Sequence, residues 1–318
     1  MIAAERLVTR LEELGRIGAT PSGGVSRLAL TPEDRRGREL VQGWMQAAGM
    51  QVRQDAAGNM IARYPGREDL PPILLVSHLD SVPEGGKYDG TLGVLAAVEV
   101  CQLFQESGYR PRYPVEVISF TMEESSRFGL SMLGSKAFVG KFRPGDLERW
   151  YDGNGVSLIE ALHQFGLDPE KVCAQTGLAG EYTLALELHI EQGLRLRTAG
   201  VPLGIVTGIA APTRLKLRMI GEAMHSGASV IEQRKDALVA GAEIITEVER
   251  LTLREKPWET IATVGQLRVA PDVINVVPGE VELGIDVRGV DMGSRRRLVR
   301  AIEQTAARVA ARRAMTVR

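Results

Sequence analysis

One short, glycine-rich stretch of the chain carries four potential metal ligands: His78, Asp80, Glu84 and Asp89. The apolar run 73–76 comes directly before it and predicts a buried strand of a mostly parallel sheet. His78 would then lie just past the carboxyl end of that strand, where open α/β sheets bind their ligands. We expect the Asp80 carboxylate to accept a hydrogen bond from the second ring nitrogen of His78 and so to select its tautomer. A polar turn is the alternative, because turns favour Asp, Gly and Pro.

Two further segments are expected to bring acidic and histidine side chains to the same edge of the sheet. Residues 114–121 predict a second strand, which continues into the adjacent acids Glu123 and Glu124. Residues 183–193 alternate, so that apolar side chains share one face and His189 shares the other with two glutamates. Imidazole and carboxylate ligands without thiolates favour a catalytic Zn²⁺, or Mn²⁺, Co²⁺ or Ni²⁺, over a closed structural zinc site. A solvated histidine and a solvated pair of acids are the alternatives.

Together these motifs resemble those of a known family. The matching segments are His78-x-Asp80, Asp89 in Tyr-Asp-Gly, the pair Glu123-Glu124, and His189 in Leu-His-Ile-Glu-Gln-Gly. They are similar to motifs of the hydantoinase/carbamoylase group of dinuclear-metal amidohydrolases, within the wider M20 metallopeptidase superfamily. The resemblance covers nearly the whole chain. It implies an α/β fold, with an M20-like catalytic domain whose mixed sheet is flanked by helices, and a ferredoxin-like βαββαβ lid or dimerisation domain.

The resemblance also implies which residues hold metal. His78, Asp89 and His189 would bind one of two divalent ions, either zinc or manganese, cobalt or nickel. Asp89 would bridge to the second ion, which Glu124 would also bind. Glu123 would act first as general base and then as general acid. Related peptidases usually carry a carboxylate in place of His189, so a histidine there favours the carbamoylase branch.

Other matching positions imply roles in catalysis and in substrate binding. Asp80 belongs to the catalytic set, and His225, in Gly-x-Ala-x-His-Ser-Gly, would reach across a dimer to stabilise the developing oxyanion. Asn275 and Arg288 would hold the carboxylate of the substrate. Gln192 and His225 would also contact the substrate. From the residues alone, a loop role for His225 and a surface ion pair for Arg288 stay open.

The composition agrees with a soluble enzyme, and the small-molecule substrate is what the family resemblance implies. The 318 residues include 39 basic and 40 acidic side chains, a net charge of −1, and no basic patch favours nucleic acid or membrane. Cys101 and Cys173 match no disulfide framework and are typical of packing residues in a reducing cytosol. The charged segment 1–16 predicts a helix and not a signal peptide, so we expect a cytoplasmic protein.

We expect two domains, a catalytic metal-binding domain over 1–211 and a lid or dimerisation domain over 212–318. In the first, a helix over 31–50 and a hairpin over 51–63 precede the metal-bearing strands. The second has the order βαββα followed by the start of one more strand. Its predicted elements are 214–220, 234–251, 260–269, 281–288, 294–311 and 315–318. The family's lid dimerises through a helix and an edge strand, so a homodimer is expected.

Family chains return from the lid to the catalytic domain, and the returning segment supplies a further histidine ligand. This chain contains four histidines, of which His225 is the last. We therefore expect a C-terminally truncated member whose incomplete catalytic domain holds one metal ion or none. A fragment of a longer enzyme is the favoured interpretation, and a truncated paralogue is the alternative.

The expected reaction is metal-dependent hydrolysis of a linear C–N bond in a ureido or carbamoyl acid, such as an N-carbamoyl-L-amino acid or an allantoate-like substrate. Two other functions stay open. One is an M20-type aminoacylase or peptidase. The other is a non-catalytic paralogue that only dimerises.

Overall fold

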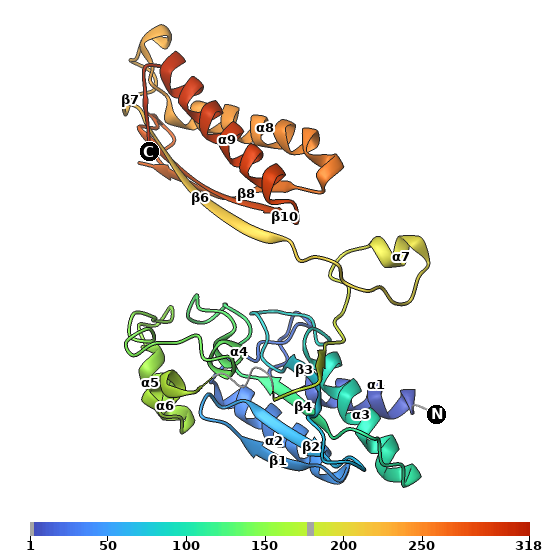
Figure 1. Cartoon of the computed structure of the whole chain (residues 1–318). Helices are drawn as coiled ribbons and strands as arrows, with labels where there is room; N and C mark the ends of the chain where they lie inside the picture. Colours follow the sequence, from blue (N-terminus) through green and yellow to red (C-terminus); the bar gives the residue numbers. More distant parts are fainter. Residues whose placement is uncertain (1–2, 177–180) are drawn as a thin grey trace. The chain divides into compact units, whose positions relative to one another are not determined.

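The computed structural model describes residues 3–176 and 181–318. The chain divides into two compact units, Met1–Ala199 and Gly200–Arg318, both drawn in Figure 1. Each unit has its own sheet and its own hydrophobic core. None of the described helices combines the length and the apolar character needed to span a lipid bilayer.

The first unit is built on a five-stranded sheet in the order β1-β2-β4-β3-β5. Its strands are β1 (Gln51–Gln54), β2 (Met60–Tyr64), β3 (Ile73–His78), β4 (Val115–Phe120) and β5 (Leu184–Leu186). β1 and β2 form the expected antiparallel hairpin, and β2 is also antiparallel to β4, whereas β3 is parallel to β4 and β5. The sheet is therefore mixed, as the family resemblance implies. His78 is the last residue of β3, whereas the sequence predicted that it would lie just past the end of the strand.

Helices cover both faces of this sheet. The helices of this unit are α1 (Ala4–Gly15), α2 (Pro32–Ala47), α3 (Thr91–Ser107), α4 (Leu133–Phe138), α5 (Leu158–Phe165), α6 (Pro169–Ala174) and α7 (Arg195–Ala199), of which α1 to α4 pack on the sheet. α1, α2 and α3 share one core with apolar side chains of β2, β3 and β4. On the opposite face, Ile61, Leu74 and Ile118 pack against Phe138 of α4. Both faces of β2 and β4 therefore carry apolar side chains that pack against helices.

Local signals place α2 and α3. The Thr31 side chain caps α2 by accepting a hydrogen bond from the Asp34 N–H at 3.3 Å, and Pro32 occupies the first helical position. α3 ends at Gly108, whose left-handed backbone closes the helix. Since α3 begins directly after Gly90, it brings the turn that contains Asp89 to the carboxyl edge of β3.

β5 is much shorter than the alternation of residues 183–193 predicts. It covers three exposed residues and, within the described part of the chain, pairs with β3 alone. The chain then crosses the first turn of α3, where a Cβ at Gly93 would lie 2.5 Å from the Leu188 carbonyl oxygen. His189 and Glu191 therefore follow the strand, and the predicted strand face does not exist. Alternation predicts which side chains would share a face of a strand. A segment stays extended only where it pairs with a neighbouring strand.

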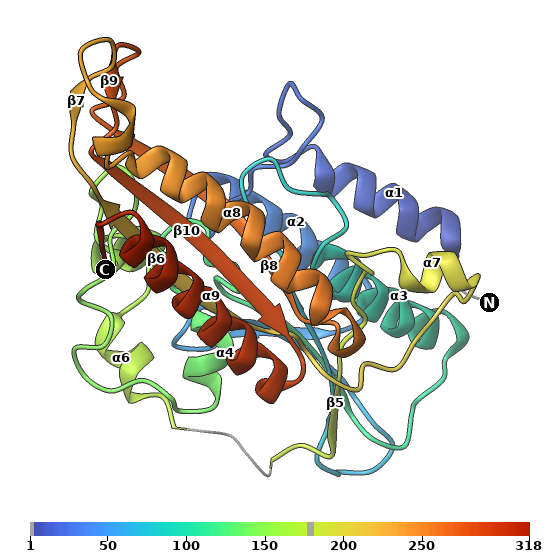
Figure 2. The ribbon, with the colours of Figure 1, turned by 90° about the horizontal axis from the view of Figure 1, so that it is seen from above.

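The second unit is a ferredoxin-like βαββαβ fold, as expected. Its sheet has the order β11-β6-β10-β8 and is antiparallel throughout. The elements are β6 (Ala211–Ile220), α8 (Ala237–Arg254), β8 (Ile261–Ala270), β10 (Glu280–Gly289), α9 (Met292–Arg312) and β11 (Thr316–Val317). α8 and α9 lie side by side over one face of this sheet (Figure 2). Two main-chain hydrogen bonds between Arg318 and Arg218 extend the pairing of β11 with β6.

A second, two-stranded sheet stands at one end of this fold. It pairs β7 (Met224–His225) with β9 (Val276–Val277). Two short 3-10 turns, η1 (Ile231–Gln233) and η2 (Lys256–Trp258), precede α8 and β8. Because Ile220 at the end of β6 pairs with Glu280 at the start of β10, this small sheet lies at the end of the larger sheet where β10 begins.

Candidate metal centre and active site

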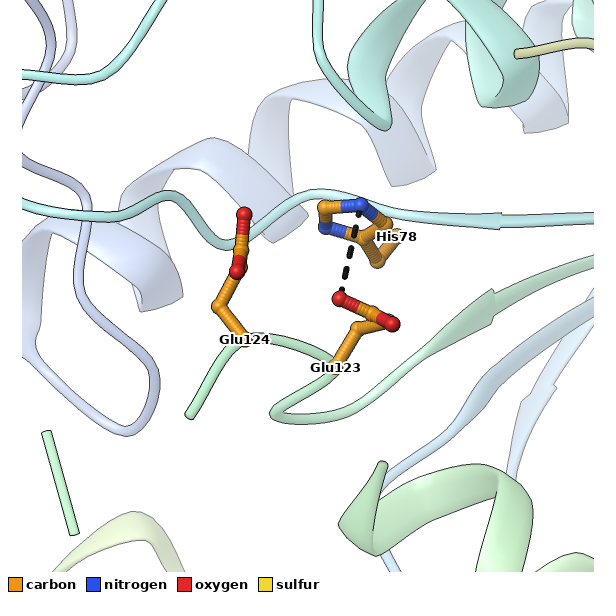
Figure 3. Close-up of side chains that lie close together, drawn as sticks. All are labelled: His78, Glu123 and Glu124. Atoms are coloured by element: carbon orange, nitrogen blue, oxygen red, sulfur yellow. Dashed lines mark ion pairs between the residues drawn. The ribbon is translucent and has the colours of Figure 1, made fainter. Parts of the chain in front are cut away.

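Three side chains converge where β3 and β4 end. His78, Glu123 and Glu124 offer one ligand atom each, and these atoms all lie within 4.8 Å of one another (Figure 3). His78 Nε2 lies 3.9 Å from Glu123 Oε2. His78 is buried and the two glutamates are half-buried. Parallel pairing places His78 beside Phe120, so the residues that follow β4 arrive at the imidazole, as the strand-end argument predicts.

Asp80 connects the histidine to the two glutamates through the main chain. Its carboxylate accepts hydrogen bonds from the N–H groups of Glu123 at 3.2 Å and Glu124 at 3.0 Å. His78 Nδ1 lies 2.9 Å from the Asp80 main-chain carbonyl oxygen but 3.6 Å from its carboxylate. The sequence predicted the Asp80 carboxylate as the partner of the imidazole. In the structure the partner is the Asp80 main-chain carbonyl instead. A carbonyl can only accept, so Nδ1 carries a proton, and in the neutral imidazole Nε2 presents its lone pair to the cluster.

Asp89, His189 and Gln192 form a second group. His189 Nε2 lies 3.3 Å from Asp89 Oδ1, and Gln192 Nε2 donates to Asp89 Oδ2 at 2.7 Å. The Ile190 carbonyl lies 2.8 Å from His189 Nδ1, so Nε2 again presents a lone pair. Asp89 Oδ1 is buried and no described group donates a hydrogen bond to it. Two facing acceptors are stabilised only by a proton or a cation between them.

A glycine lets the turn that carries Asp89 approach the buried imidazole. A Cβ at Gly90 would lie 2.5 Å from the ring of His78, and the φ of Gly90 is +66°. Only glycine adopts this backbone at this distance without strain. Glu84, the fourth acid of the same stretch, turns away from the site and accepts from Thr20 Oγ1 at 2.6 Å. The spacing of residues in this stretch did not distinguish Glu84 from the others.

One acidic residue of the site was not singled out from the sequence. Ser77 Oγ, at the end of β3, donates to Glu187 Oε1 at 3.0 Å. Glu187 also interacts electrostatically with Glu123, so it belongs to the same carboxylate-rich region. The available signal was its position two residues before His189.

Crowding and burial shift the protonation of these side chains. Burial raises the pKa of Glu123; His78 opposes this effect, and the carboxylates of Asp80 and Glu187 add to it. Burial and the neighbouring Glu123 raise the pKa of Glu124. Burial by itself lowers the pKa of His78, but hydrogen bonding and charge interaction with Asp80 outweigh it and raise the pKa to about 9. The site therefore favours bound positive charge.

These observations fit a divalent cation. The donors are imidazole nitrogens and carboxylate oxygens, which suit zinc and the neighbouring transition metals. The buried oxygen of Asp89 lacks a donor, and both imidazoles present Nε2. We see no comparable feature that points to an organic cofactor in the described residues.

The second unit brings two of its three predicted site residues together. His225 on β7 is paired with Val276 on β9, and the Ser226 N–H donates to the Asn275 carbonyl oxygen at 3.0 Å. Arg288 lies at the far end of β10, eight residues after Glu280, which corresponds to roughly 25 Å along a strand. It makes the alternative contact, an ion pair with Asp286 at 2.7 Å. One chain therefore does not bring Arg288 and Asn275 to the same carboxylate.

Comparison with known proteins identifies the class. Residues 59–150 match the model of peptidase family M28, and residues 212–314 match the peptidase dimerisation domain. The N-carbamoyl-L-amino acid amidohydrolase of Geobacillus stearothermophilus is 45% identical and covers 98% of this chain and 76% of its own length. The ureidoglycolate hydrolase of Arabidopsis thaliana is 37% identical and covers 98% of this chain and 67% of its own length. A solved hydantoinase/carbamoylase family amidase from Burkholderia ambifaria has a TM-score of 0.84 at 40% identity, covering 100% of this chain and 76% of its own.

The chain therefore belongs to the hydantoinase/carbamoylase family of amidohydrolases. It is a hydrolase that acts on non-peptide carbon–nitrogen bonds of linear amides. The matches to metallopeptidase families, together with the cluster of His78, Glu123 and Glu124, imply that it uses divalent metal ions. The family resemblance drawn from the motifs is confirmed.

Proposed function

We propose that this protein hydrolyses N-carbamoyl-L-amino acids, releasing the amino acid and a carbamate that decomposes to CO₂ and ammonia. The observation that carries the proposal is the convergence of His78, Glu123 and Glu124 beside the pair formed by Asp89 and His189. The 45% identity to a protein that bears this activity in its name supports the substrate class.

The metal assignment follows the two groups of side chains. His78, Asp89 and His189 would hold one divalent cation, and Glu124 would hold a second that shares Asp89. Zinc is the first candidate, and manganese, cobalt and nickel accept the same donors. Bound cations would supply positive charge that makes water acidic near neutral pH and polarises the scissile carbonyl.

Glu123 is the proposed proton carrier. Its raised pKa and its position beside the ligand Glu124 suit a carboxylate that takes a proton from the attacking water. The same group then returns the proton to the nitrogen of the departing amino acid. Asp80 holds the main chain of both glutamates and thereby orients them.

Substrate recognition is assigned to both domains of a homodimer. In this proposal residues 1–211 form the catalytic domain and 212–318 the lid, and Gln192 contacts the substrate from the catalytic domain. The partner's lid supplies two residues, His225 for the oxyanion and Asn275 for the substrate carboxylate. Since Arg288 lies at the opposite end of β10, the substrate carboxylate would meet Asn275 and Arg288 from different protomers.

We infer the cellular location from the thiols. Both cysteines are free, and Cys101 is buried. This supports our inference of a reducing, cytoplasmic compartment.

The test is a substrate panel with metal control. The purified protein is stripped with a chelator and then assayed with zinc, manganese, cobalt or nickel. Substrates are N-carbamoyl-L-amino acids, their D enantiomers, allantoate, N-acetyl-L-amino acids and dipeptides. Metal-dependent release of ammonia from the N-carbamoyl-L compounds supports the proposal. Preferential cleavage of N-acetyl compounds or dipeptides would instead identify an aminoacylase or peptidase, which the names of the two matched peptidase models favour.

A further inference from the structure

Thr121 joins β4 to the segment that carries Glu123 and Glu124, and it is completely buried. Two residues from distant parts of the first unit hold it. Arg38, on α2, donates from Nη2 to Thr121 Oγ1 at 2.7 Å. The Thr121 N–H donates to Asn59 Oδ1 at 2.9 Å. Both the side chain and the main chain of Thr121 are therefore anchored immediately before the two glutamates.

Arg38 is itself fixed in three directions. Its Nε donates to Asp34 Oδ1 at 3.2 Å, and its Nη1 donates to the Gly58 carbonyl oxygen at 3.0 Å. Its Nη2 is used by Thr121. A buried guanidinium cannot turn to another partner without leaving one of these acceptors unsatisfied. Arg38 is therefore a rigid support.

Asn59 is equally constrained. It has no exposed surface, and its Nδ2 donates to Asp55 Oδ2 at 2.8 Å and to the Gly134 carbonyl oxygen at 3.0 Å. A Cβ at Gly134 would lie 2.0 Å from Asn59 Oδ1. This single amide thus joins the β1–β2 hairpin, the end of β4 and the start of α4, since Thr121 uses its remaining acceptor.

The loop that follows Thr121 is closed at its base. Carbonyl oxygens on the outgoing side accept hydrogen bonds from N–H groups on the returning side. The pairs are Thr121 with Gly134 at 2.8 Å, Met122 with Leu133 at 3.0 Å, and Glu123 with Met132 at 2.9 Å. A displacement of Thr121 would therefore move the main chain at Glu123.

We propose that Arg38, Asn59 and Thr121 form a positioning clamp that sets the main-chain position of Glu123 and Glu124. The inference rests on the proposed function, because it assumes that these glutamates move protons and bind metal. Arg38 binds the side chain and Asn59 the main chain of Thr121, before the glutamates. Asp80 holds the same segment at the N–H groups of the glutamates themselves. They act through position, and a displacement of about 1 Å at a catalytic group can lower a rate by about 10²-fold.

The test uses substitutions at Thr121 with a matched control. Thr121→Val keeps the branched shape but removes the acceptor for Arg38, whereas Thr121→Ser keeps the hydroxyl. The control is Thr305→Val in α9 of the second unit, because Thr305 is buried and accepts from Arg308 Nη2 at 2.8 Å. The measurements on the full chain are kcat, KM, the metal dissociation constant, and amide hydrogen exchange over residues 121–134.

Thr121→Val is expected to lower kcat by at least about tenfold with little change in KM, and to weaken metal binding. Exchange should accelerate at the Glu123 and Glu124 amides and not across the rest of the unit. Thr121→Ser and Thr305→Val should behave like the wild type. Wild-type kcat and exchange in Thr121→Val would overturn the clamp, as would an equal loss in Thr121→Ser.

Arg38→Lys covers the case in which Thr121→Val does not fold. Lysine keeps the charge beside Asp34 but cannot reach all three acceptors, so the same losses are expected. Combined with Thr121→Val, it should cause less than the sum of the two separate losses, because both variants remove the hydrogen bond between Arg38 and Thr121. If the wild-type protein cleaves nothing in the substrate panel, the proposed function fails. Metal affinity and local hydrogen exchange then still decide whether the clamp exists.

Discussion

His189 Nε2 and Asp89 Oδ1 lie 3.3 Å apart, and both are acceptors in the arrangement that the surrounding groups select. The main-chain carbonyl of Ile190 takes the only proton of a neutral imidazole at Nδ1. Gln192 donates to the other oxygen of Asp89 and leaves Oδ1 without a donor. This pair is therefore the part of the site that most directly requires a cation or a proton between its two acceptors.

His189→Ala is expected to lower metal affinity by about 10- to 100-fold or more, because it removes a ligand. His163→Ala is the control, since His163 is an exposed histidine on α5. Isothermal titration with zinc after chelation measures both. Equal affinities of the two variants would remove His189 from the ligand set.

Glu123→Gln is expected to retain metal and lose about 10²- to 10⁴-fold in kcat, because the amide cannot accept the proton. Glu124→Gln should instead lower metal occupancy, since it removes a carboxylate ligand. Metal content by elemental analysis and kcat at saturating metal separate the two effects. A near-normal rate in Glu123→Gln would assign the proton transfer to another group.

Metal binding should strengthen as pH rises to about 9. The pKa of His78 is raised to about 9 in the metal-free protein, so the imidazole is protonated below that pH and must lose its proton to bind metal. The apparent affinity should therefore fall by up to about tenfold for each pH unit below 9. Titrations between pH 6 and 10 in buffers of different ionisation enthalpy will measure the proton release. Affinity that is constant from pH 7 to 9 would contradict this linkage.

Gly90→Ala is expected to disrupt the site. The new Cβ would lie 2.5 Å from the His78 ring at a φ of +66°, so the turn or the imidazole must move. We expect a loss of at least about 1 kcal/mol in the free energy of unfolding and weaker metal binding. Gly86→Ala is the control, because a Cβ there meets nothing within 4 Å. Thermal unfolding and metal titration of both variants test this, and identical behaviour would show that the turn is free to rearrange.

The proposed dimer predicts complementation between two inactive variants. Glu123→Gln lacks the proton carrier and His225→Ala lacks the residue assigned to the partner's site. Mixed dimers would contain one intact site, so an equimolar mixture should recover about a quarter of wild-type activity after subunit exchange. Activity that stays at the level of the separate variants would place His225 in its own protomer's site or outside catalysis.

Much of this arrangement could be predicted from local pattern. The capped start of α2, the apolar run of α3 and the glycine after it describe their own elements, because helix periodicity and capping act within a few residues. The order of strands and helices in the second unit was sufficient to predict its ferredoxin-like fold. The residue types of the metal cluster followed from their positions at the ends of β3 and β4, since parallel strands end at one edge.

Other features depended on contacts between residues far apart in the chain. The strand expected over 183–193 ends at Leu186 because the chain then crosses α3. The alternation of apolar and polar residues does not predict this crossing. The imidazole of His78 meets the carbonyl of Asp80, while the Asp80 carboxylate meets main-chain N–H groups 43 and 44 residues away.

The sequence by itself determined which chemical groups the site contains, the family and the order of elements, because residue types and short-range periodicity are properties of the chain. Only the tertiary structure decided their grouping. It paired Asp89 with His189, separated Arg288 from Asn275 along β10, and joined Arg38 and Asn59 at Thr121. These contacts arise when buried polar groups must each find a partner, and that requirement is met across the whole folded unit rather than within a segment.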